Sequence, residues 1–334
     1  MIGVDRKIGS GCRMRNWFGG IAMAILAIVP SSVLARPLVV AYVPNWIELE
    51  TFAETIPYEK VTHLNVAFEN PVDDAGTLSF DKSVSVLIEK AHAKKVKVLI
   101  SIGGGSASGD ATLKARYAGL LSTPETRGGF SEKLLEYVKA HDFDGLDVDL
   151  EGPSIDANYG EFIAELGKRF KPSGKVLTAA LSKGYGGERV PDSVFQHFDF
   201  VNIMAYDGAG YWSPDAPGQH SSFEFAADNT RYWLKRGLPK EKAVLGLPFY
   251  GYGFGKAFKK RDYPYATIVN EYAGAEDQDE IGSTIYYNGL PTTRKKCVYA
   301  LKEGLAGVMI WSLDSDVTGP RSLLSAIHQT LQGK

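Results

Sequence analysis

Four acidic side chains lie close together in the segment 144–151, whose sequence is DGLDVDLE. Successive side chains of a β-strand point to opposite faces, so a strand here places Asp147, Asp149 and Glu151 on one face and the apolar residues between them on the other. Asp144 is out of phase with these three acids. Because apolar residues separate the carboxyl groups, we interpret the segment as a row of catalytic groups rather than an ordinary solvated run of charge.

Carboxyl groups packed along one strand cannot all ionise at low cost. Each negative charge raises the pKa of its neighbours, and the set titrates together. A proton shared within the row would keep Glu151 protonated near neutral pH, as a general acid requires. The sequence therefore predicts acid–base chemistry with Glu151 as the proton donor.

The same acids could instead bind a cation. The pattern Asp147-x-Asp149-x-Glu151-Gly152 is similar to the start of an EF-hand loop, but its twelfth position is Asn158 rather than Glu, and strand residues flank it. We therefore reject calcium, and a Mg²⁺ or Mn²⁺ site on these carboxylates stays as the alternative. The chain has six histidines and no HExxH or CxxC pattern, which leaves little material for a His or Cys metal site. We predict neither a metal nor a cofactor.

Eight short apolar runs are the candidate strands that must position these acids. They begin near Leu38, Val61, Val96, Phe143, Val176, Phe200, Ala243 and Ala306. Apolar residues recur at helical spacing between them, as in 84–91, 162–170 and 323–331. Near-continuous apolar runs are typical of parallel strands buried on both faces. We therefore predict an α/β fold with a single (β/α)8 TIM barrel, and an open doubly wound sheet is the alternative.

In a barrel, the end of the fourth strand is a place for chemistry. Gly152 and Pro153 must end that strand directly after Glu151, which puts Glu151 at the C-terminal rim, where barrel enzymes carry their active sites. The longest connection follows the seventh strand, from Gly251 to Gly304. We predict a helix over 294–303 and irregular chain before it. This connection is then a modest excursion between strands 7 and 8, too short for a second core.

The chain of 334 residues carries 37 Lys and Arg against 39 Asp and Glu and is 44% hydrophobic. This composition excludes a disordered chain, a collagen-like repeat and a disulfide-rich scaffold. No basic excess indicates nucleic acid as a partner. The length suffices for a large core, and we expect a monomer.

Basic residues precede an apolar run from Trp17 to Val29, and a small-residue pattern ends at Ala35. These features predict a secretory signal peptide over residues 1–35, cleaved after Ala35, and a barrel domain over residues 36–334. We expect the mature protein to be secreted or periplasmic, without an internal disulfide because Cys297 is then its sole cysteine. An uncleaved N-terminal anchor is the alternative, and the only membrane contact that we expect.

The acid run matches the D-x-x-D-x-D-x-E pattern of glycoside hydrolase family 18, which comprises chitinases and related endo-β-N-acetylglucosaminidases. Four further segments resemble motifs of this family on the expected strands: SIGG at 101–104, MAYD at 204–207, GLPFYG at 246–251 and MIWSLD at 309–314. The resemblance covers roughly Leu38 to Leu331. It implies a (β/α)8 catalytic domain over 36–334 and a hydrolase that retains the anomeric configuration with help from its substrate.

The resemblance also implies roles for the acids. Glu151 would protonate the glycosidic oxygen, while the 2-acetamido group of the substrate would attack the anomeric carbon and form an oxazolinium ion. Asp149 would orient that acetamido group, and Asp147 would hold or exchange a proton with Asp149. Asp144 would support the strand.

Six further residues would surround the sugar or the acids. By resemblance, Tyr206 and Asp207 would contact the sugar that carries the acetamido group. Met204 and Trp311 would line its pocket, with the Trp311 ring as the apolar floor. Tyr42 and Ser101 would support Asp147 from below.

The chain departs from the family in two respects. Many members carry an aromatic residue directly after S-x-G-G, where this chain has Gly105; Trp46 and Trp212 are candidates to supply that stacking. The excursion is too short for the larger insertion that deepens the cleft of many members, so we predict a shallow groove and endo-type cleavage. Chitin or another oligosaccharide that contains N-acetylglucosamine is the expected partner. N-glycans are an alternative substrate, and a non-catalytic lectin is the alternative from another functional class.

Overall fold

Eight parallel strands close into a barrel in the computed structural model, which describes residues 36–333. The predicted signal peptide lies outside the described residues. The barrel strands are β1 (Leu38–Pro44), β2 (His63–Ala67), β3 (Lys97–Gly103), β4 (Gly145–Asp149), β5 (Val176–Leu181), β6 (Phe200–Ile203), β7 (Ala243–Pro248) and β12 (Gly307–Trp311). Their order around the barrel is β1-β12-β7-β6-β5-β4-β3-β2. The predicted TIM barrel is confirmed, and the open sheet is excluded.

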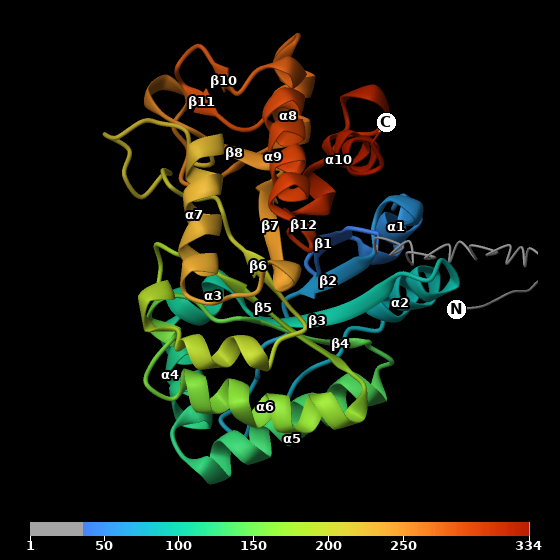
Figure 1. The fold of residues 1–334 in the computed structure, drawn as a ribbon, viewed down its shortest axis with the longest axis vertical. Helices are drawn as coiled ribbons and strands as arrows, with labels where there is room; N and C mark the ends of the chain where they lie inside the picture. The colour runs from blue at the N-terminus through green and yellow to red at the C-terminus, as the bar shows by residue number, and fades with distance from the viewer. Residues whose placement is uncertain (1–35, 334) are drawn as a thin grey trace, which may run out of the picture. The chain divides into compact units, whose positions relative to one another are not determined.

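Helices surround the strands (Figure 1). They are α1 (Leu49–Ala53), α2 (Ser83–Ala93), α3 (Gly104–Gly109), α4 (Ala111–Leu121), α5 (Pro124–Ala140), α6 (Tyr159–Ser173), α7 (Phe223–Lys235), α9 (Leu290–Glu303) and α10 (Leu323–Leu331). The apolar faces predicted over 84–91 and 162–170 are the buried faces of α2 and α6. Helix ends follow ordinary capping chemistry, since α5 begins with a capping box at Thr123 and α6 ends at the left-handed Gly174.

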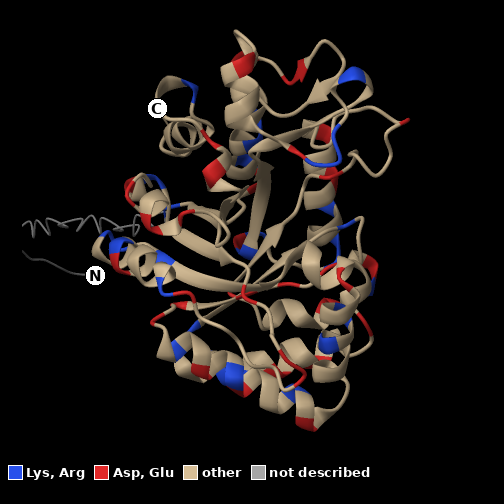
Figure 2. Ribbon diagram, turned by 180° about the vertical axis from the view of Figure 1, so that it is seen from behind, with Lys and Arg blue, Asp and Glu red and all other residues tan. Residues whose placement is uncertain are grey.

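The core has two layers that differ in position. Apolar side chains fill the space between the strands and the helices. A second cluster of aromatic and apolar side chains lies inside the barrel, among them Tyr42, Met204, Tyr206 and Met309. Figure 2 shows that charged residues of both signs are mixed along helices and loops. Acidic side chains inside the barrel are therefore exceptions to the charge distribution and need a chemical explanation.

The excursion after β7 is more regular than predicted. It contains β8 (Tyr250–Gly253), β9 (Tyr263–Pro264), α8 (Tyr265–Glu271), β10 (Glu280–Ile281) and β11 (Ile285–Tyr286), whose strands pair antiparallel in the order β10-β11-β8-β9. The prediction of irregular chain was wrong here, because strands of two residues are too short for a detectable alternation. Helix α9 also starts earlier than predicted, at Leu290, with Pro291 in its first turn.

Within residues 36–333, no helix combines the length and the hydrophobicity that crossing a membrane requires. The same residues hold no group of three or more His, Cys, Asp or Glu side chains arranged to bind a metal ion.

Candidate active site

Asp147 lies inside the barrel at the centre of a hydrogen-bond cluster. Its Oδ2 accepts from the hydroxyl groups of Tyr42 at 2.6 Å and Ser101 at 2.7 Å. Its Oδ1 accepts from the hydroxyl of Thr178 at 2.5 Å and from Asn202 Nδ2 at 3.3 Å. Burial raises the pKa of Asp147, and these donors oppose the rise because they stabilise the ionised form. Four strands thus hold one buried carboxyl group.

Asp149 has a different environment two residues further along β4. Its side chain is buried, and its Oδ1 has no hydrogen-bond partner. Burial raises the pKa of Asp149 well above its usual value, and the charges of Glu151 and Asp147 add to that rise. The backbone of Gly103 runs beside it on β3. Asp149 is thus a buried acid with one oxygen atom available for a further hydrogen bond.

Glu151 follows directly after β4, in extended conformation, and precedes the short helical turn Gly152–Ser154. It therefore continues the strand alternation toward the C-terminal rim. Burial raises the pKa of Glu151 to about 7, and the charge of Asp207 contributes to the rise. The sequence predicted this direction, but it attributed the rise to acids of the same strand. The structure adds Asp207, from the segment that follows β6.

Asp207 is held by side chains from the excursion and from the loop before α7. Its Oδ1 accepts hydrogen bonds from the hydroxyl groups of Tyr250 at 2.5 Å and Tyr252 at 3.0 Å. His220 Nδ1 lies 3.7 Å from the same oxygen atom. The backbone of Asp207 is left-handed, with φ +64°, which is uncommon for a residue other than glycine. The end of β6 is thus built to place this carboxylate at one position.

A row of aromatic rings lies beside the acids. Trp311, at the end of β12, has its ring 5.4 Å from that of Tyr42 and stacks on Phe68 at 5.6 Å. Phe68 in turn stacks on Trp46 at 6.4 Å, and Trp46 is 64% exposed. On another side, the exposed Trp212 packs edge-on against Tyr252 at 5.3 Å. Both tryptophans are therefore packed against neighbouring rings and open to solvent.

Two other predicted residues lie in distinct places. Met204 is buried in the aromatic cluster inside the barrel. Asp144 lies near the amino end of β4, away from the row of acids, where its Oδ2 accepts from the backbone N–H of Val98 at 2.8 Å and lies 2.9 Å from His92 Nε2. It joins β4 to β3 and to α2 and does not approach the other acids.

Six residues of this arrangement were missed in the sequence: Phe68, Thr178, Asn202, His220, Tyr250 and Tyr252. Thr178 and Asn202 did carry a signal, because each is a polar residue inside an otherwise apolar strand. The others come from loops and from the excursion, whose geometry no periodicity describes.

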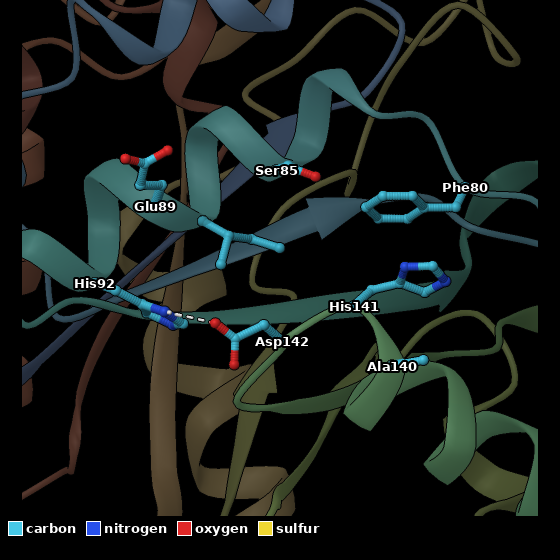
Figure 3. A pocket seen from close by; sticks show the side chains of 8 residues that line it. Phe80, Ser85, Glu89, His92, Ala140, His141 and Asp142 are labelled. Carbon is cyan, nitrogen blue, oxygen red and sulfur yellow. Dashed lines mark ion pairs between the residues drawn. The ribbon is translucent and has the colours of Figure 1, made fainter.

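A cavity of about 450 Å³ lies elsewhere, between α2 and the end of α5 (Figure 3). His92, His141, Asp142 and Phe80 are among its lining residues, and the rings of Phe80 and His141 stack at 3.8 Å. None of the acids at the end of β4 lines it. The buried carboxyl groups at the end of β4, rather than this cavity, mark the candidate active site.

Comparisons with known proteins bear on the family and the fold. The sequence model of the glycosyl hydrolases of family 18 matches residues 38–316. The crystal structure of the family 18 chitinase ChiB from Flavobacterium johnsoniae is similar, with a TM-score of 0.82 and 37% identity over 89% of this chain and 94% of that one. The endochitinase of Manduca sexta is 26% identical over 91% of this chain and 68% of its own length.

Human YKL-39 has the same fold, with a TM-score of 0.76 over 89% of this chain and all of that one. It is described as a pseudo-chitinase that retains chitooligosaccharide binding. Because its identity to this chain is 22%, the likeness shows the fold alone.

Proposed function

Since the chain belongs to the glycosyl hydrolases of family 18 and is thus a glycoside hydrolase of the chitinase type, we propose that it cleaves β-1,4 bonds between N-acetylglucosamine units in chitin or chitooligosaccharides. The proposal includes retention of the anomeric configuration and catalysis assisted by the substrate. One observation carries it: Glu151, with a pKa raised to about 7, follows the buried Asp149, whose Oδ1 has no partner. This pair offers a proton donor and an acceptor for an acetamido N–H.

In the first step, the protonated Glu151 carboxyl group gives its proton to the glycosidic oxygen as that oxygen leaves the anomeric carbon. The carbonyl oxygen of the 2-acetamido group forms a bond to the same carbon and gives an oxazolinium ion. Asp149 accepts a hydrogen bond from the acetamido nitrogen and stabilises the positive charge there. In the second step, water adds to the anomeric carbon, Glu151 takes its proton, and the oxazolinium ring opens. Two displacements give a product with the original β configuration.

The other predicted residues support these steps. Asp147 is positioned by Tyr42 and Ser101 and can exchange a proton with Asp149. The Tyr206 hydroxyl and the Asp207 carboxylate are assigned to the sugar that carries the acetamido group. Trp311 provides an aromatic surface for the apolar face of that sugar. The acids and the substrate supply all the groups that the reaction needs, so no cofactor is proposed.

We propose endo-type cleavage in a shallow groove, with Trp46 and Trp212 as stacking surfaces for sugars on either side of the cleaved bond. Both rings are exposed, and an exposed indole presents an apolar face to a pyranose ring. N-glycans share the same bond chemistry and are the alternative substrate. A non-catalytic lectin is disfavoured because Glu151, Asp149 and Asp147 are all present.

The role of the acetamido group can be tested with matched substrates. We expect the mature enzyme to cleave N-acetylated chitohexaose and to leave its fully de-N-acetylated counterpart intact, because the latter lacks the nucleophile. Product analysis by mass spectrometry would measure both reactions, with a chitobiose-core N-glycan as a third substrate. Equal cleavage of both hexamers would rule out assistance by the substrate, and cleavage of the N-glycan alone would favour the alternative substrate.

We further propose that the protein is exported to the periplasm or the medium as a monomer, with cleavage after Ala35. The mass of the protein recovered outside the cytoplasm should correspond to a chain that starts at Arg36. Its light-scattering mass should correspond to one chain. Retention in the membrane fraction would instead support the uncleaved anchor.

A further inference from the structure

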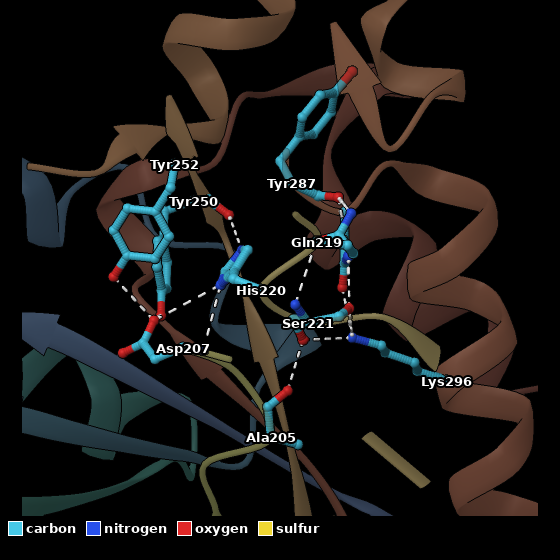
Figure 4. A network of polar contacts seen from close by, with 10 residues as sticks. Ala205, Asp207, Gln219, His220, Ser221, Tyr250, Tyr252, Tyr287 and Lys296 are labelled. Carbon is cyan, nitrogen blue, oxygen red and sulfur yellow. Dashed lines mark hydrogen bonds and ion pairs between the residues drawn. The ribbon is translucent and has the colours of Figure 1, made fainter. Parts of the chain in front are cut away.

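A fully buried lysine on α9 donates hydrogen bonds to the segment that follows β6. Lys296 Nζ donates to the backbone oxygen of Ser221 at 2.7 Å, to the Ser221 hydroxyl at 2.7 Å and to Asn288 Oδ1 at 2.6 Å (Figure 4). An ammonium group has three protons to donate, and these three acceptors use all of them. All three acceptors are uncharged oxygen atoms, so the lysine is satisfied by hydrogen bonds rather than by an ion pair.

Ser221 connects Lys296 to the segment that follows β6. Its hydroxyl donates to the backbone oxygen of Ala205 at 2.6 Å, and Ala205 directly precedes Tyr206 and Asp207. The neighbouring His220 is fully buried. Its Nδ1 accepts from the backbone N–H of Asp207 at 3.4 Å, so its Nε2 carries the proton and donates to the Tyr250 carbonyl oxygen at 3.2 Å.

The excursion holds the same segment from another side. Gln219 Nε2 donates to the backbone oxygen atoms of Asp279 at 3.1 Å and Tyr287 at 2.6 Å. Asn288 Nδ2 donates to the Ser221 oxygen at 2.9 Å. The three residues 219–221 are therefore hydrogen-bonded to the segment that follows β6, to the excursion and to α9, and their position fixes the backbone of Asp207.

A lysine is a costly residue for this place. Burial lowers the pKa of Lys296 to about 7, although the charges of Asp279, Cys297 and Glu224 around it act in the opposite direction. Methionine has a similar length and would avoid this desolvation penalty, but it would leave the buried Asn288 Oδ1 without its donor. Lys296 therefore holds Ser221 and Asn288 in place at the cost of its own desolvation.

We propose that Lys296 is a positioning residue of the hydrolase, which acts through Ser221 and His220 to hold the Asp207 carboxylate at a fixed place relative to Glu151. This inference rests on the proposed function for its catalytic consequence. Asp207 raises the pKa of Glu151, together with burial. The ionisable groups around the Asp207 carboxylate are Glu151, Tyr206, Tyr250, Tyr252, His220 and Asp262. If the segment 219–221 relaxes, the Asp207 charge moves away from Glu151 and the pKa of Glu151 falls.

The test uses Lys296→Met and two readouts. The first is a ¹³C NMR titration of the Glu151 carboxyl carbon, assigned by its loss in Glu151→Gln, which needs no catalysis. The second is the pH profile of kcat/KM on N-acetylated chitohexaose. We expect the Glu151 titration and the basic limb of the profile both to move to lower pH by about half a unit or more. We also expect kcat to fall about tenfold with little change in KM.

Lys242→Met is the matched control. Lys242 also donates to two backbone carbonyl groups, of Phe195 and Phe198, but it lies before β7 at the amino end of the barrel. This variant should keep the wild-type titration. If Lys296→Met does not fold, the Glu151 titration is measured in Ser221→Ala instead. This variant removes only the hydroxyl that joins Lys296 to Ala205.

A folded Lys296→Met with an unchanged Glu151 titration would overturn the proposal, and so would an unchanged titration in Ser221→Ala where that variant decides. A wild-type protein that cleaves no substrate would refute the proposed function instead. The NMR titration would still decide between a positioning role and a structural role for Lys296.

Discussion

The carboxyl groups of Asp147 and Asp149 on β4 and of Glu151 directly after it lie in three different environments. Asp147 has four hydrogen-bond donors, Asp149 has an oxygen atom without a partner, and Glu151 lies at the rim, where burial and Asp207 raise its pKa to about 7. The residue types alone predicted a row of interacting acids. Which acid keeps its proton depends on donors from four other strands and loops, and those neighbours are set by barrel closure rather than by local spacing.

The pKa of Glu151 predicts the basic limb of the pH profile. The general acid must be protonated in the first step, so kcat/KM should fall as the pH rises through about 7. Asp207→Asn removes a negative charge that raises this pKa, so the limb should move to lower pH, in addition to any loss of sugar binding. Asp215→Asn, an exposed position in the same segment, should leave the limb in place. A limb that stays unchanged in Asp207→Asn would show that burial alone sets the pKa of Glu151.

At the scale of elements, the site depends on the close approach of β3 to β4. Gly103 has a left-handed backbone with φ +105°, and a Cβ atom there would lie 2.3 Å from the Asp149 backbone oxygen. No other residue fits without moving the strand that carries the acids. The next helix starts at Gly104 and leaves Gly105 open, with no atom within 4 Å of an added Cβ.

This pair of glycines gives a matched test. Gly103→Ala should destabilise the protein by about 1–3 kcal/mol. It should also lower kcat/KM about 100-fold or more, because it displaces Asp149 and Glu151 relative to the substrate. Gly105→Ala should change neither quantity measurably. Thermal unfolding and steady-state kinetics of both variants would check this, and an active, stable Gly103→Ala would mean that β4 tolerates the shift.

Elements differ in how far the sequence could predict them. The barrel strands were visible because each is a buried apolar run, and the helices because their apolar faces recur at helical spacing. The strands of the excursion could not be predicted from the sequence. β9, β10 and β11 have two residues each and are defined by pairing between distant segments. Tyr252, on β8, and Phe68, directly after β2, could not be assigned to the site because contacts between distant segments bring them there.

At the scale of the whole molecule, the distribution of charged residues does not direct the substrate toward one face of the protein. The chain carries a net charge of −2, and both signs are mixed over its helices and loops (Figure 2). N-acetylated chitooligosaccharides are uncharged, so long-range attraction has no part in their binding. Recognition must come from the aromatic surfaces and from hydrogen bonds at the end of the barrel.

Because long-range electrostatic attraction has no part in substrate binding, the kinetics should depend only weakly on the salt concentration. The kcat/KM for N-acetylated chitohexaose should change less than about twofold between about 20 and 500 mM NaCl, because screening acts mainly on exposed charges. A steep fall with salt would contradict this picture and indicate a charged substrate. Steady-state kinetics at constant pH across the salt series would measure it.

The most direct test of the account is the anomeric configuration of the first product. Proton NMR of fresh hydrolysate from N-acetylated chitohexaose should show the β-anomer before mutarotation, and Glu151→Gln should lower the rate about 100-fold or more while the protein remains folded. This result would establish retention with Glu151 as the acid. Initial release of the α-anomer, or full activity in Glu151→Gln, would contradict the central claim.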